Sequence, residues 1–317
     1  MLTASSREST TAVLAALDRA LRALDCSLDV LLAFVPQGEE IACMYAEGTR
    51  AEHFDGLRLR RDGPALPARA ASSGHRVELT AESQAVIPTD RAAVAIPMAA
   101  EGRLLAVVYA ATTRPRIDAV DPLVCAVTQA AAPFALAAER EADRRSATYD
   151  GLTGLYTPRA FREKLQEELN AAQLAPHASL ALWFVDTDHF KRVNDTLGHA
   201  TGDMVLGRMA ALLRAYLVPQ MDLPARNGGD EFCAIVRNVE KLEAIERAQR
   251  FCDAVRAADF GIGLPITASV GVAAYPYDAA GAAQLLEVAD AAMYHSKRGG
   301  RDRVSFATGG GAFAVFS

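Results

Sequence analysis

Residues 226–232 read Arg-Asn-Gly-Gly-Asp-Glu-Phe and place two carboxylates beside a glycine turn. Asn-Gly ahead of an apolar run predicts a β-hairpin, because both central residues of such a turn adopt positive φ. The run 232–236 predicts the buried strand that follows. Paired carboxylates on a turn suit a hard cation and a phosphate. An ordinary solvated turn is the alternative interpretation of this segment alone.

A third carboxylate, Asp186, follows the unbroken apolar run 180–185, which has the length of a buried strand. A carboxylate at the end of a buried strand is better placed for a site than for a core. Asp188 is interpreted instead as the N-cap of the helix that follows. If Asp186 meets Asp230 and Glu231, each close pair of charges repels by about 4 kcal/mol at 4 Å and an effective dielectric of 20.

A divalent cation would reverse the sign of that interaction. A ligand set made only of oxygen atoms favours Mg²⁺ or Mn²⁺ and disfavours zinc. Magnesium in such sites usually keeps contacts to substrate phosphates. The carboxylates therefore predict a nucleoside triphosphate as the substrate.

Alternating helices and strands must hold these groups in place. Apolar residues at helical spacing predict helices around 161–169, 205–213, 242–255 and 282–297. The apolar run 180–185, the glycine hairpin, the alternating segment 266–272 and residues 303–306 predict strands. This order predicts a mixed sheet covered by helices.

The chain resembles the GGDEF family of diguanylate cyclases over roughly residues 148–306. Several separate segments match in order. They are Asp150-Gly151-Leu152-Thr153-Gly154-Leu155, Asp186-Thr187-Asp188-His189-Phe190-Lys191, the segment 194–203, the glycine turn, Ala268-Ser269-Val270-Gly271-Val272, Ala289-Asp290-Ala291-Ala292-Met293-Tyr294, Lys297 and Arg301. The resemblance implies a polymerase-palm-like mixed sheet covered by helices.

The resemblance also implies a role for each matching position. Mg²⁺ or Mn²⁺ would be bound by Asp186, the Thr187 carbonyl, Asp230 and Glu231, and the last two are the expected catalytic carboxylates. Asp230 would also help to deprotonate the ribose 3′-hydroxyl. The residues expected to bind GTP are Asn194, His199 and Asp203 at the guanine, and Phe190, Lys191, Lys297 and Arg301 near the phosphates.

The implied reaction joins two GTP molecules into cyclic di-GMP, by attack of a 3′-hydroxyl on an α-phosphate with loss of pyrophosphate. Since one domain holds one GTP, the resemblance implies a homodimer. Asp203 accepts two hydrogens from the guanine edge, which argues against a cyclase for adenine nucleotides. A catalytically silent module that binds GTP or relays a signal is the alternative.

One inhibitory site of the family is altered in this chain. Many members carry Arg-x-x-Asp before the glycine turn, and here that stretch reads Pro219-Gln220-Met221-Asp222. Because proline lacks a charge and a side-chain donor, product inhibition at this position is expected to be weak or absent. Asn227 is also unusual for the family, and it is expected to touch no proposed ligand.

The first 140 residues predict a separate α+β domain. A helix at 10–24, strands at 30–35 and 41–46, and a hairpin of 94–98 with 104–110 precede a long helix at 121–148. That helix would reach about 40 Å, and Pro133 should kink or split it. The layout resembles a GAF domain, an antiparallel sheet with helices, and a PAS domain is the alternative.

This sensory domain is expected to bind an unknown small ligand or signal or to dimerise, and His53 and His75 are minor candidates for haem or metal ligands. The organisation predicted for the whole chain is a two-domain α+β and α/β protein. Residues 1–140 form the GAF-like domain, 121–148 the connector helix, 148–308 the cyclase domain and 309–317 a flexible tail.

The bulk composition is that of a globular protein, with 51% hydrophobic and 23% charged residues among 317. A net charge of −6 argues against non-specific binding to nucleic acid or anionic membranes. No apolar run approaches the roughly 18 residues of a membrane span, and no secretion signal is recognised. The five scattered cysteines, Cys26, Cys43, Cys125, Cys233 and Cys252, predict buried thiols in a reducing compartment, and a cytoplasmic location.

Overall fold

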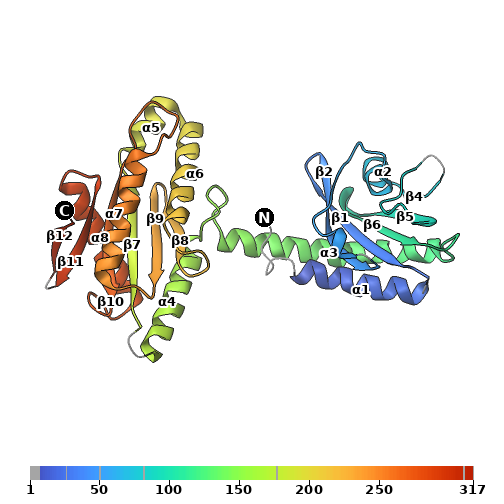
Figure 1. The fold of residues 1–317 in the computed structure, drawn as a ribbon, viewed down its shortest axis with the longest axis horizontal. Coiled ribbons are helices and arrows are strands. Elements are labelled where there is room, and N and C mark those ends of the chain that lie inside the picture. The colour runs from blue at the N-terminus through green and yellow to red at the C-terminus, as the bar shows by residue number, and fades with distance from the viewer. Residues whose placement is uncertain are drawn as a thin grey trace. The chain divides into compact units, whose positions relative to one another are not determined.

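The chain divides into two compact units in the computed structural model, Met1–Arg144 and Arg145–Ser317. The structure describes residues 8–25, 27–49, 51–80, 83–175, 178–309 and 311–316. Each unit has its own six-stranded sheet and its own apolar core (Figure 1).

The N-terminal unit is built on an antiparallel sheet in the order β3-β2-β1-β6-β5-β4. Its strands are β1 (Val30–Gln37), β2 (Glu40–Gly48), β3 (Arg58–Arg60), β4 (Val77–Glu78), β5 (Ala92–Ala100) and β6 (Arg103–Thr112). Its helices are α1 (Glu8–Leu24), the 3₁₀ turn η2 (Ala51–His53), α2 (Leu66–Ser73) and α3 (Val120–Thr148).

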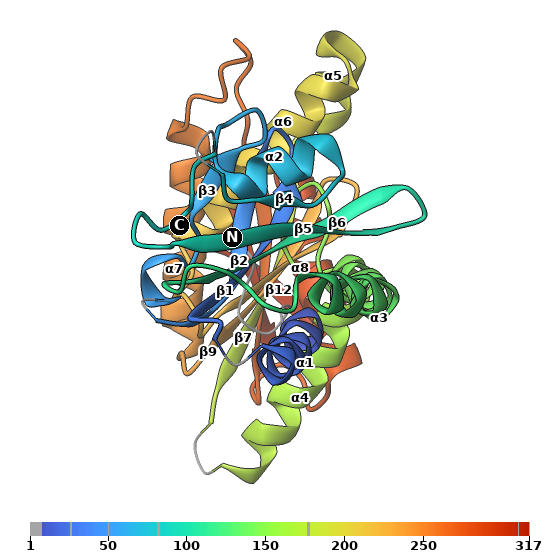
Figure 2. The same ribbon diagram turned by 90° about the vertical axis from the view of Figure 1, so that its right-hand side faces the viewer.

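Helices cover both faces of this sheet. Helices α1 and α3 lie side by side on one face, and α2 lies on the other (Figures 1 and 2). The predicted apolar stripe of α1 is confirmed, since Leu14, Leu17 and Leu21 are buried. Helix α2 was not predicted, because its small residues carry a weak apolar pattern and proline commonly ends a helical pattern. Proline is tolerated in the first turn of a helix, which is where Pro67 lies.

The predicted hairpin of β5 and β6 is present with a tighter turn than expected. Ala100 pairs with Arg103, so only Glu101 and Gly102 connect the strands. Both have positive φ, of 50° and 74°, as a two-residue turn of this kind requires.

Helix α3 runs without interruption through Pro133, so proline does not split it, and the kink stays a prediction. Proline has no amide hydrogen, so Pro133 cannot donate to the carbonyl of Gln129 one turn earlier. Both residues are exposed, and this carbonyl is therefore open to solvent. By length and composition alone, α3 is also apolar enough to span a membrane, with a window of mean hydropathy 1.4. The prediction that no such segment exists therefore fails. Four residues of α3, Leu123, Val127, Ala131 and Phe134, pack into the core of the N-terminal unit.

The C-terminal unit has a mixed sheet in the order β12-β11-β10-β7-β9-β8, in which only β10 and β11 run parallel. Its strands are β7 (Leu180–Thr187), β8 (Leu223–Gly228), β9 (Glu231–Arg237), β10 (Ala268–Tyr275), β11 (Arg303–Gly309) and β12 (Ala312–Val315). Its helices are α4 (Pro158–Leu174), α5 (Phe190–Leu197), α6 (His199–Ala215), α7 (Lys241–Ala257) and α8 (Ala282–Arg298).

Two helical layers enclose this sheet. Helices α5, α6 and α7 contribute to the core on one face, and α4 and α8 to the core on the other. Strand β7 is buried along its whole length, as its unbroken apolar run predicts. Helix α8 approaches β10 so closely that a Cβ at Gly271 would lie 2.1 Å from the Ala289 carbonyl oxygen. Only glycine permits that approach, which sets the position of α8 on the sheet.

The tail is not loose where the structure describes it, contrary to the prediction for 309–317. Residues 312–315 form the edge strand β12, which pairs antiparallel with β11. The Phe316 amide donates to the Val304 carbonyl (2.9 Å), and its ring packs against the core. Gly310 and Ser317 lie outside the described residues.

Three of the five cysteines, Cys43, Cys233 and Cys252, are buried free thiols, as predicted. Burial raises the pKa of the Cys43 thiol to about 11. Cys125 is exposed on α3, which the apolar surroundings in the sequence did not indicate. Cys26 lies outside the described residues.

Candidate active site

The residues proposed to bind metal lie at one end of the C-terminal sheet. In the β7–β9 ladder, Asp186 is the direct cross-strand partner of Glu231. Directly opposed residues of neighbouring strands project from the same face, so the two carboxylates share one side of the sheet edge. Asp230 precedes Glu231 in the turn, and its carbonyl accepts hydrogen bonds from the amide and hydroxyl of Thr187, both at 3.2 Å. The strand end with Asp186 and the turn with Asp230 and Glu231 are therefore adjacent, as expected.

Asp186 is a buried carboxylate, with 4% of the residue exposed. Burial raises its pKa to about 6, and the charge of Asp230 adds to the shift, while the ammonium of Lys297 opposes it. Lys297 Nζ lies 2.6 Å from Asp186 Oδ2. The pKa of Asp230 is also raised, chiefly by burial. Burial therefore disfavours the ionised form of both carboxylates, and repulsion from neighbouring carboxylates adds to this effect.

A hard divalent cation fits this donor set, because every donor is oxygen and the site carries excess negative charge. In the described part of the chain, however, no three His, Cys, Asp or Glu side chains come close enough together to hold an ion. Two of the carboxylates have other partners: Asp186 is paired with Lys297, and Glu231 is bound by Asn227. Binding of a cation would have to replace or rearrange these contacts.

Asn227 contacts a proposed metal ligand, which corrects the prediction that it touches none. Its Nδ2 donates to Glu231 Oε2 at 3.1 Å. Asn227 is also not a central residue of the hairpin turn. The positive φ values belong to Gly228 (148°) and Gly229 (51°), and Gly228 already pairs with Glu231. Asn227 lies at a bulge of β8, where the regular alternation of the strand is interrupted.

Two residues to which the sequence assigned no role fix the glycine turn. Arg226 donates through Nε and Nη2 to the Gly229 carbonyl, at 3.0 and 2.7 Å. Its Nη1 lies 3.3 Å from Asp150 Oδ2. Asp150 also accepts hydrogen bonds from the amide and hydroxyl of Thr153, at 2.8 and 2.6 Å. The segment 150–155 is therefore connected to the turn that carries Asp230. The sequence did not reveal this connection, because the two segments are far apart along the chain.

Asp188 is not a helix N-cap, so that interpretation is wrong. Helix α5 begins at Phe190, and its N-cap is His189, which has φ of 60° and forms no side-chain capping bond. The Asp188 carboxylate is instead fully buried. It accepts hydrogen bonds from Thr267 Oγ1 and Ser269 Oγ, both at 2.7 Å, and from the Asp302 amide at 3.1 Å. A buried carboxylate needs such donors, and they come from segments about 80 and 114 residues away.

The residues expected at the guanine lie on α5 and at the start of α6. Asn194 is half-buried against α6, where a Cβ at Gly202 would lie 2.0 Å from Asn194 Oδ1. Glycine at 202 therefore creates the space that Asn194 occupies. His199 and Asp203 are exposed near the N-terminal end of α6. Their use as ligands for a base remains a prediction.

The residues expected at the phosphates come from two segments. Phe190 is half-buried and Lys191 exposed in the first turn of α5. Lys297 lies in the last turn of α8, and Arg301 follows in the turn before β11, with its Nε 4.0 Å from Asp188 Oδ1. Thus Lys297 pairs with Asp186 and Arg301 approaches Asp188, which places both cations beside the end of β7.

Asp222, retained from the altered inhibitory segment, is used inside the protein. It is buried, its Oδ2 accepts from Arg247 Nη2 (2.6 Å) and the Val218 amide (2.8 Å), and its Oδ1 accepts from the Arg237 amide (3.0 Å). These bonds leave the carboxylate little capacity for an external ligand. Together with the proline at 219, these bonds support the expectation of a weak inhibitory site.

A family model described as diguanylate cyclase, GGDEF domain, matches residues 147–303. A crystal structure of the coiled coil and GGDEF domain of DgcB from Caulobacter crescentus, in complex with c-di-GMP, is 33% identical. The match has a TM-score of 0.51 and covers 56% of this chain and 95% of that one. This chain belongs to the GGDEF domain family. The resemblance inferred from the sequence motifs is confirmed for residues 147–303.

Two curated relatives from Pseudomonas aeruginosa also match the GGDEF domain. The diguanylate cyclase DgcP is 39% identical over 170 residues, which are 53% of this chain and 25% of the relative. The cyclic di-GMP phosphodiesterase NbdA is 40% identical over 166 residues, which are 51% of this chain and 21% of the relative. The chain thus spans a quarter or less of either relative. The GAF-like identity of the N-terminal unit is not established by these matches.

The two histidines considered as haem or metal ligands lie in the N-terminal unit, outside the GGDEF domain. His53 is exposed beside Glu52, and His75 is exposed with its Nδ1 2.8 Å from the Ser73 carbonyl. Neither belongs to a group of three potential metal ligands among the residues described. The structure therefore gives no support to a metal or haem site at either position.

Proposed function

We propose that the GGDEF domain condenses two GTP molecules into cyclic di-GMP and two pyrophosphates. The observation that carries this proposal is the acidic strand end, where Asp186 is buried, lies opposite Glu231 and has a pKa raised to about 6. Burying a carboxylate is costly, and the charge excess at this position favours a cation together with a polyphosphate.

The chemistry follows from the residues around that end. The ribose 3′-oxygen of one GTP bonds to the α-phosphorus of the other, and the bond from that phosphorus to the bridging oxygen breaks, releasing pyrophosphate. Asp230 takes the proton of the 3′-hydroxyl, a role that suits a carboxylate whose pKa is raised by burial. Lys297 and Arg301 offset the charge that develops on the departing pyrophosphate. Mg²⁺ or Mn²⁺, held by Asp186, Thr187, Asp230 and Glu231, would polarise the phosphate oxygens.

Guanine is selected in this proposal by Asn194 and Asp203, with His199 beside them. A carboxylate accepts both hydrogens of the guanine N1 and N2 edge, whereas adenine presents no matching pair. Since one GGDEF domain would bind one GTP, two copies must face each other to join two nucleotides. A homodimer with two-fold symmetry is the simplest arrangement that does so.

The N-terminal unit is proposed to regulate this reaction as a GAF-like sensory domain. Support comes from its antiparallel six-stranded sheet with helices on both faces and from α3, which leads from it to the GGDEF domain.

The direct test is incubation of the purified chain with GTP and Mg²⁺, or Mn²⁺, and mass spectrometry of the products. Cyclic di-GMP is the expected product, and Glu231→Ala should abolish its formation. A different product from GTP would contradict the proposal. Repeating the reaction with a chain beginning near residue 141 would show whether the N-terminal unit raises or lowers the rate.

A catalytically silent GGDEF module is the second candidate. The separate partners of Asp186 and Glu231 favour it, because the side chains do not gather around one point. Binding of GTP with no turnover, at saturating metal and at protein concentrations that allow dimers, would establish this alternative.

A further inference from the structure

The turn between α8 and β11, residues 299–302, has an unusual backbone. Gly300 has φ of 115°, and the next two residues, Arg301 and Asp302, have φ of 64° and 48°. The left-handed region costs a residue with a side chain roughly 1–2 kcal/mol. Two such residues in succession persist only where the surrounding contacts stabilise this backbone conformation by more than it costs.

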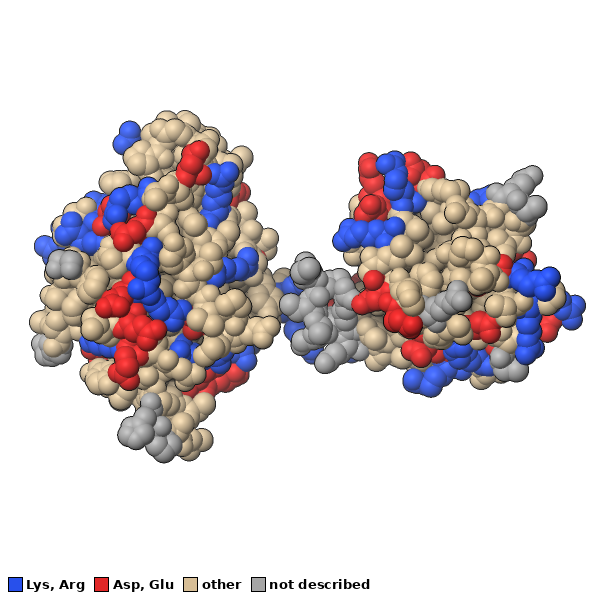
Figure 3. Space-filling view, viewed as in Figure 1, with Lys and Arg blue, Asp and Glu red and all other residues tan. Residues whose placement is uncertain are grey.

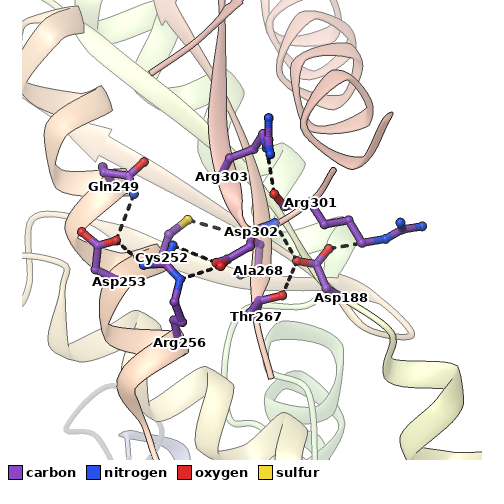
Figure 4. Close-up of polar contacts among 10 residues, drawn as sticks. All are labelled: Asp188, Gln249, Cys252, Asp253, Arg256, Thr267, Ala268, Arg301, Asp302 and Arg303. Carbon is purple, nitrogen blue, oxygen red and sulfur yellow. Dashed lines mark hydrogen bonds and ion pairs between the residues drawn. The ribbon is translucent and has the colours of Figure 1, made fainter. Parts of the chain in front are cut away.

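One side of this turn is held by Asp188. The Asp302 amide donates to Asp188 Oδ2 at 3.1 Å, and Arg301 Nε lies 4.0 Å from Asp188 Oδ1 (Figure 4). The Arg301 amide also donates to the Ser296 carbonyl at 3.0 Å, which continues the end of α8 into the turn. These contacts tie the backbone of the turn to the strand that carries Asp186.

The opposite side is held by Arg256, from α7. Its Nε and Nη2 donate to the two carboxylate oxygens of Asp302, at 2.5 and 3.0 Å, in a bidentate pair (Figure 4). Arg256 also donates to Asp253 at 2.8 Å. The hydrogen bonds from Arg256, first to Asp302 and then to Asp253, raise its pKa. A two-point contact fixes orientation as well as distance, which a single lysine bond would not do.

We propose that Arg256 and Asp302 are positioning residues, which together with Asp188 hold the turn 299–302 so that Arg301 faces the nucleotide phosphates. Arg256 lies on α7, which contributes no predicted ligand, and Asp302 directs its carboxylate toward α7. This inference rests on the proposed function of Arg301 as a phosphate ligand. Helix α7 would thus contribute indirectly to GTP binding, through Arg256 and Asp302.

Electrostatics and positioning predict opposite effects for one substitution. Asp302→Asn removes a negative charge from the turn that carries Arg301, so charge alone would tighten GTP binding. The amide keeps the size of the side chain, and asparagine tolerates positive φ, so the variant should fold. If the bidentate pair holds the turn, GTP binding weakens instead, because Arg301 is no longer fixed.

The test is steady-state kinetics with GTP for Asp302→Asn and Arg256→Met, beside Asp253→Asn. The last is the matched control, because it removes the other carboxylate bound by Arg256 and leaves the pair with Asp302 intact. We expect a rise in KM of about threefold to fivefold in the first two variants, the range for a partly exposed pair, with a smaller change in kcat. The double variant should be no worse than either single variant, and the control should match the unmodified chain.

An unchanged or lower KM for Asp302→Asn would overturn the proposal, and so would a lower Tm with unchanged KM for Arg256→Met. Binding of an α,β-methylene analogue of GTP, followed by calorimetry, separates this inference from the proposed function. If the unmodified chain binds the analogue without turning over GTP, the function fails and the variants still test the turn. If turnover is normal and analogue affinity is unaltered in both variants, the turn proposal alone fails.

Discussion

Lys297 Nζ lies 2.6 Å from Asp186 Oδ2, so the last turn of α8 supplies a positive charge to the buried carboxylate at the end of β7. Only 6% of the Asp186 side chain is exposed, against 28% for Lys297. A buried carboxylate that loses its partner is left with an uncompensated charge. The pair therefore links the stability of the domain to the same groups that are proposed to bind GTP.

Lys297→Met should lower the free energy of unfolding by about 2 kcal/mol without divalent cations, less than for a fully buried pair because the lysine is partly exposed. Mg²⁺ should recover part of this loss, since it can neutralise Asp186. Lys241→Met is the matched control: Lys241 Nζ lies 2.6 Å from the buried Asp278, near the other end of β10. In urea unfolding, Lys241→Met should also lower the free energy of unfolding, but Mg²⁺ should not change that loss. Equal behaviour of the two variants would argue against a cation at Asp186.

The raised pKa of Asp186 predicts a pH dependence with a definite sign. Its pKa is about 6 in the folded protein against an ordinary 3.8. Its stabilising contribution is therefore complete below about pH 4 and is lost as the pH rises through 6, a difference of about 3 kcal/mol in the metal-free domain. A cation needs the ionised form, so Mg²⁺ should raise Tm at pH 7.5 and much less at pH 5. Asp186→Asn should show little effect of Mg²⁺ at either pH, and a pH-independent effect in the unmodified chain would contradict the assignment.

Asn227→Ala should weaken the response to metal. Asn227 orients Glu231 through the bond of 3.1 Å, and loss of a residue that orients a metal ligand commonly costs about tenfold or more in metal affinity or activity. We expect a rise of about tenfold in the Mg²⁺ concentration that gives half-maximal turnover. Asn170→Ala, on the surface of α4, is the control. An unaltered Mg²⁺ dependence would show that Glu231 needs no such support.

Arg226→Lys should reduce turnover while the fold is kept. Lysine has one ammonium and cannot reach both the Gly229 carbonyl and Asp150, so the turn that carries Asp230 loses its fixed position. A loss of about tenfold in kcat is expected, with a modest fall in Tm. Arg159→Lys, which alters only an exposed pair with Glu163 on α4, should behave as the unmodified chain. Normal kcat in Arg226→Lys would mean that the glycine turn holds its own conformation.

Arg247→Met should destabilise the domain by about 3 kcal/mol, because it leaves the buried carboxylate of Asp222 without its charged partner. Urea unfolding measures this loss. Titration of cyclic di-GMP against the unmodified enzyme should show no tight inhibition, since Asp222 is already bonded on both oxygens. Submicromolar inhibition would show that the product finds another site or displaces Arg247.

The sequence alone determined the elements whose signal is local. The unbroken apolar run of β7, the apolar stripes of α1, α4 and α6 and the glycine hairpin were predicted because their period or composition is written in neighbouring residues. The placement of Asp186 at a strand end beside the turn with Asp230 followed from the same patterns. Helix α2 and strand β12 were missed, because a short segment forms an element only when the rest of the unit packs on it.

Only the tertiary structure decided which side chains meet. Asp188 reads as a helix cap, and its true partners lie 79, 81 and 114 residues further along the chain. Asn227 and Glu231 are close in sequence, yet their contact depends on a bulge in β8. The pairing of Arg256 with Asp302, across 46 residues, requires α7 to pack beside β11 and the turn that precedes it. Such contacts depend on register and helix packing over the whole domain, and no local pattern of residues encodes them.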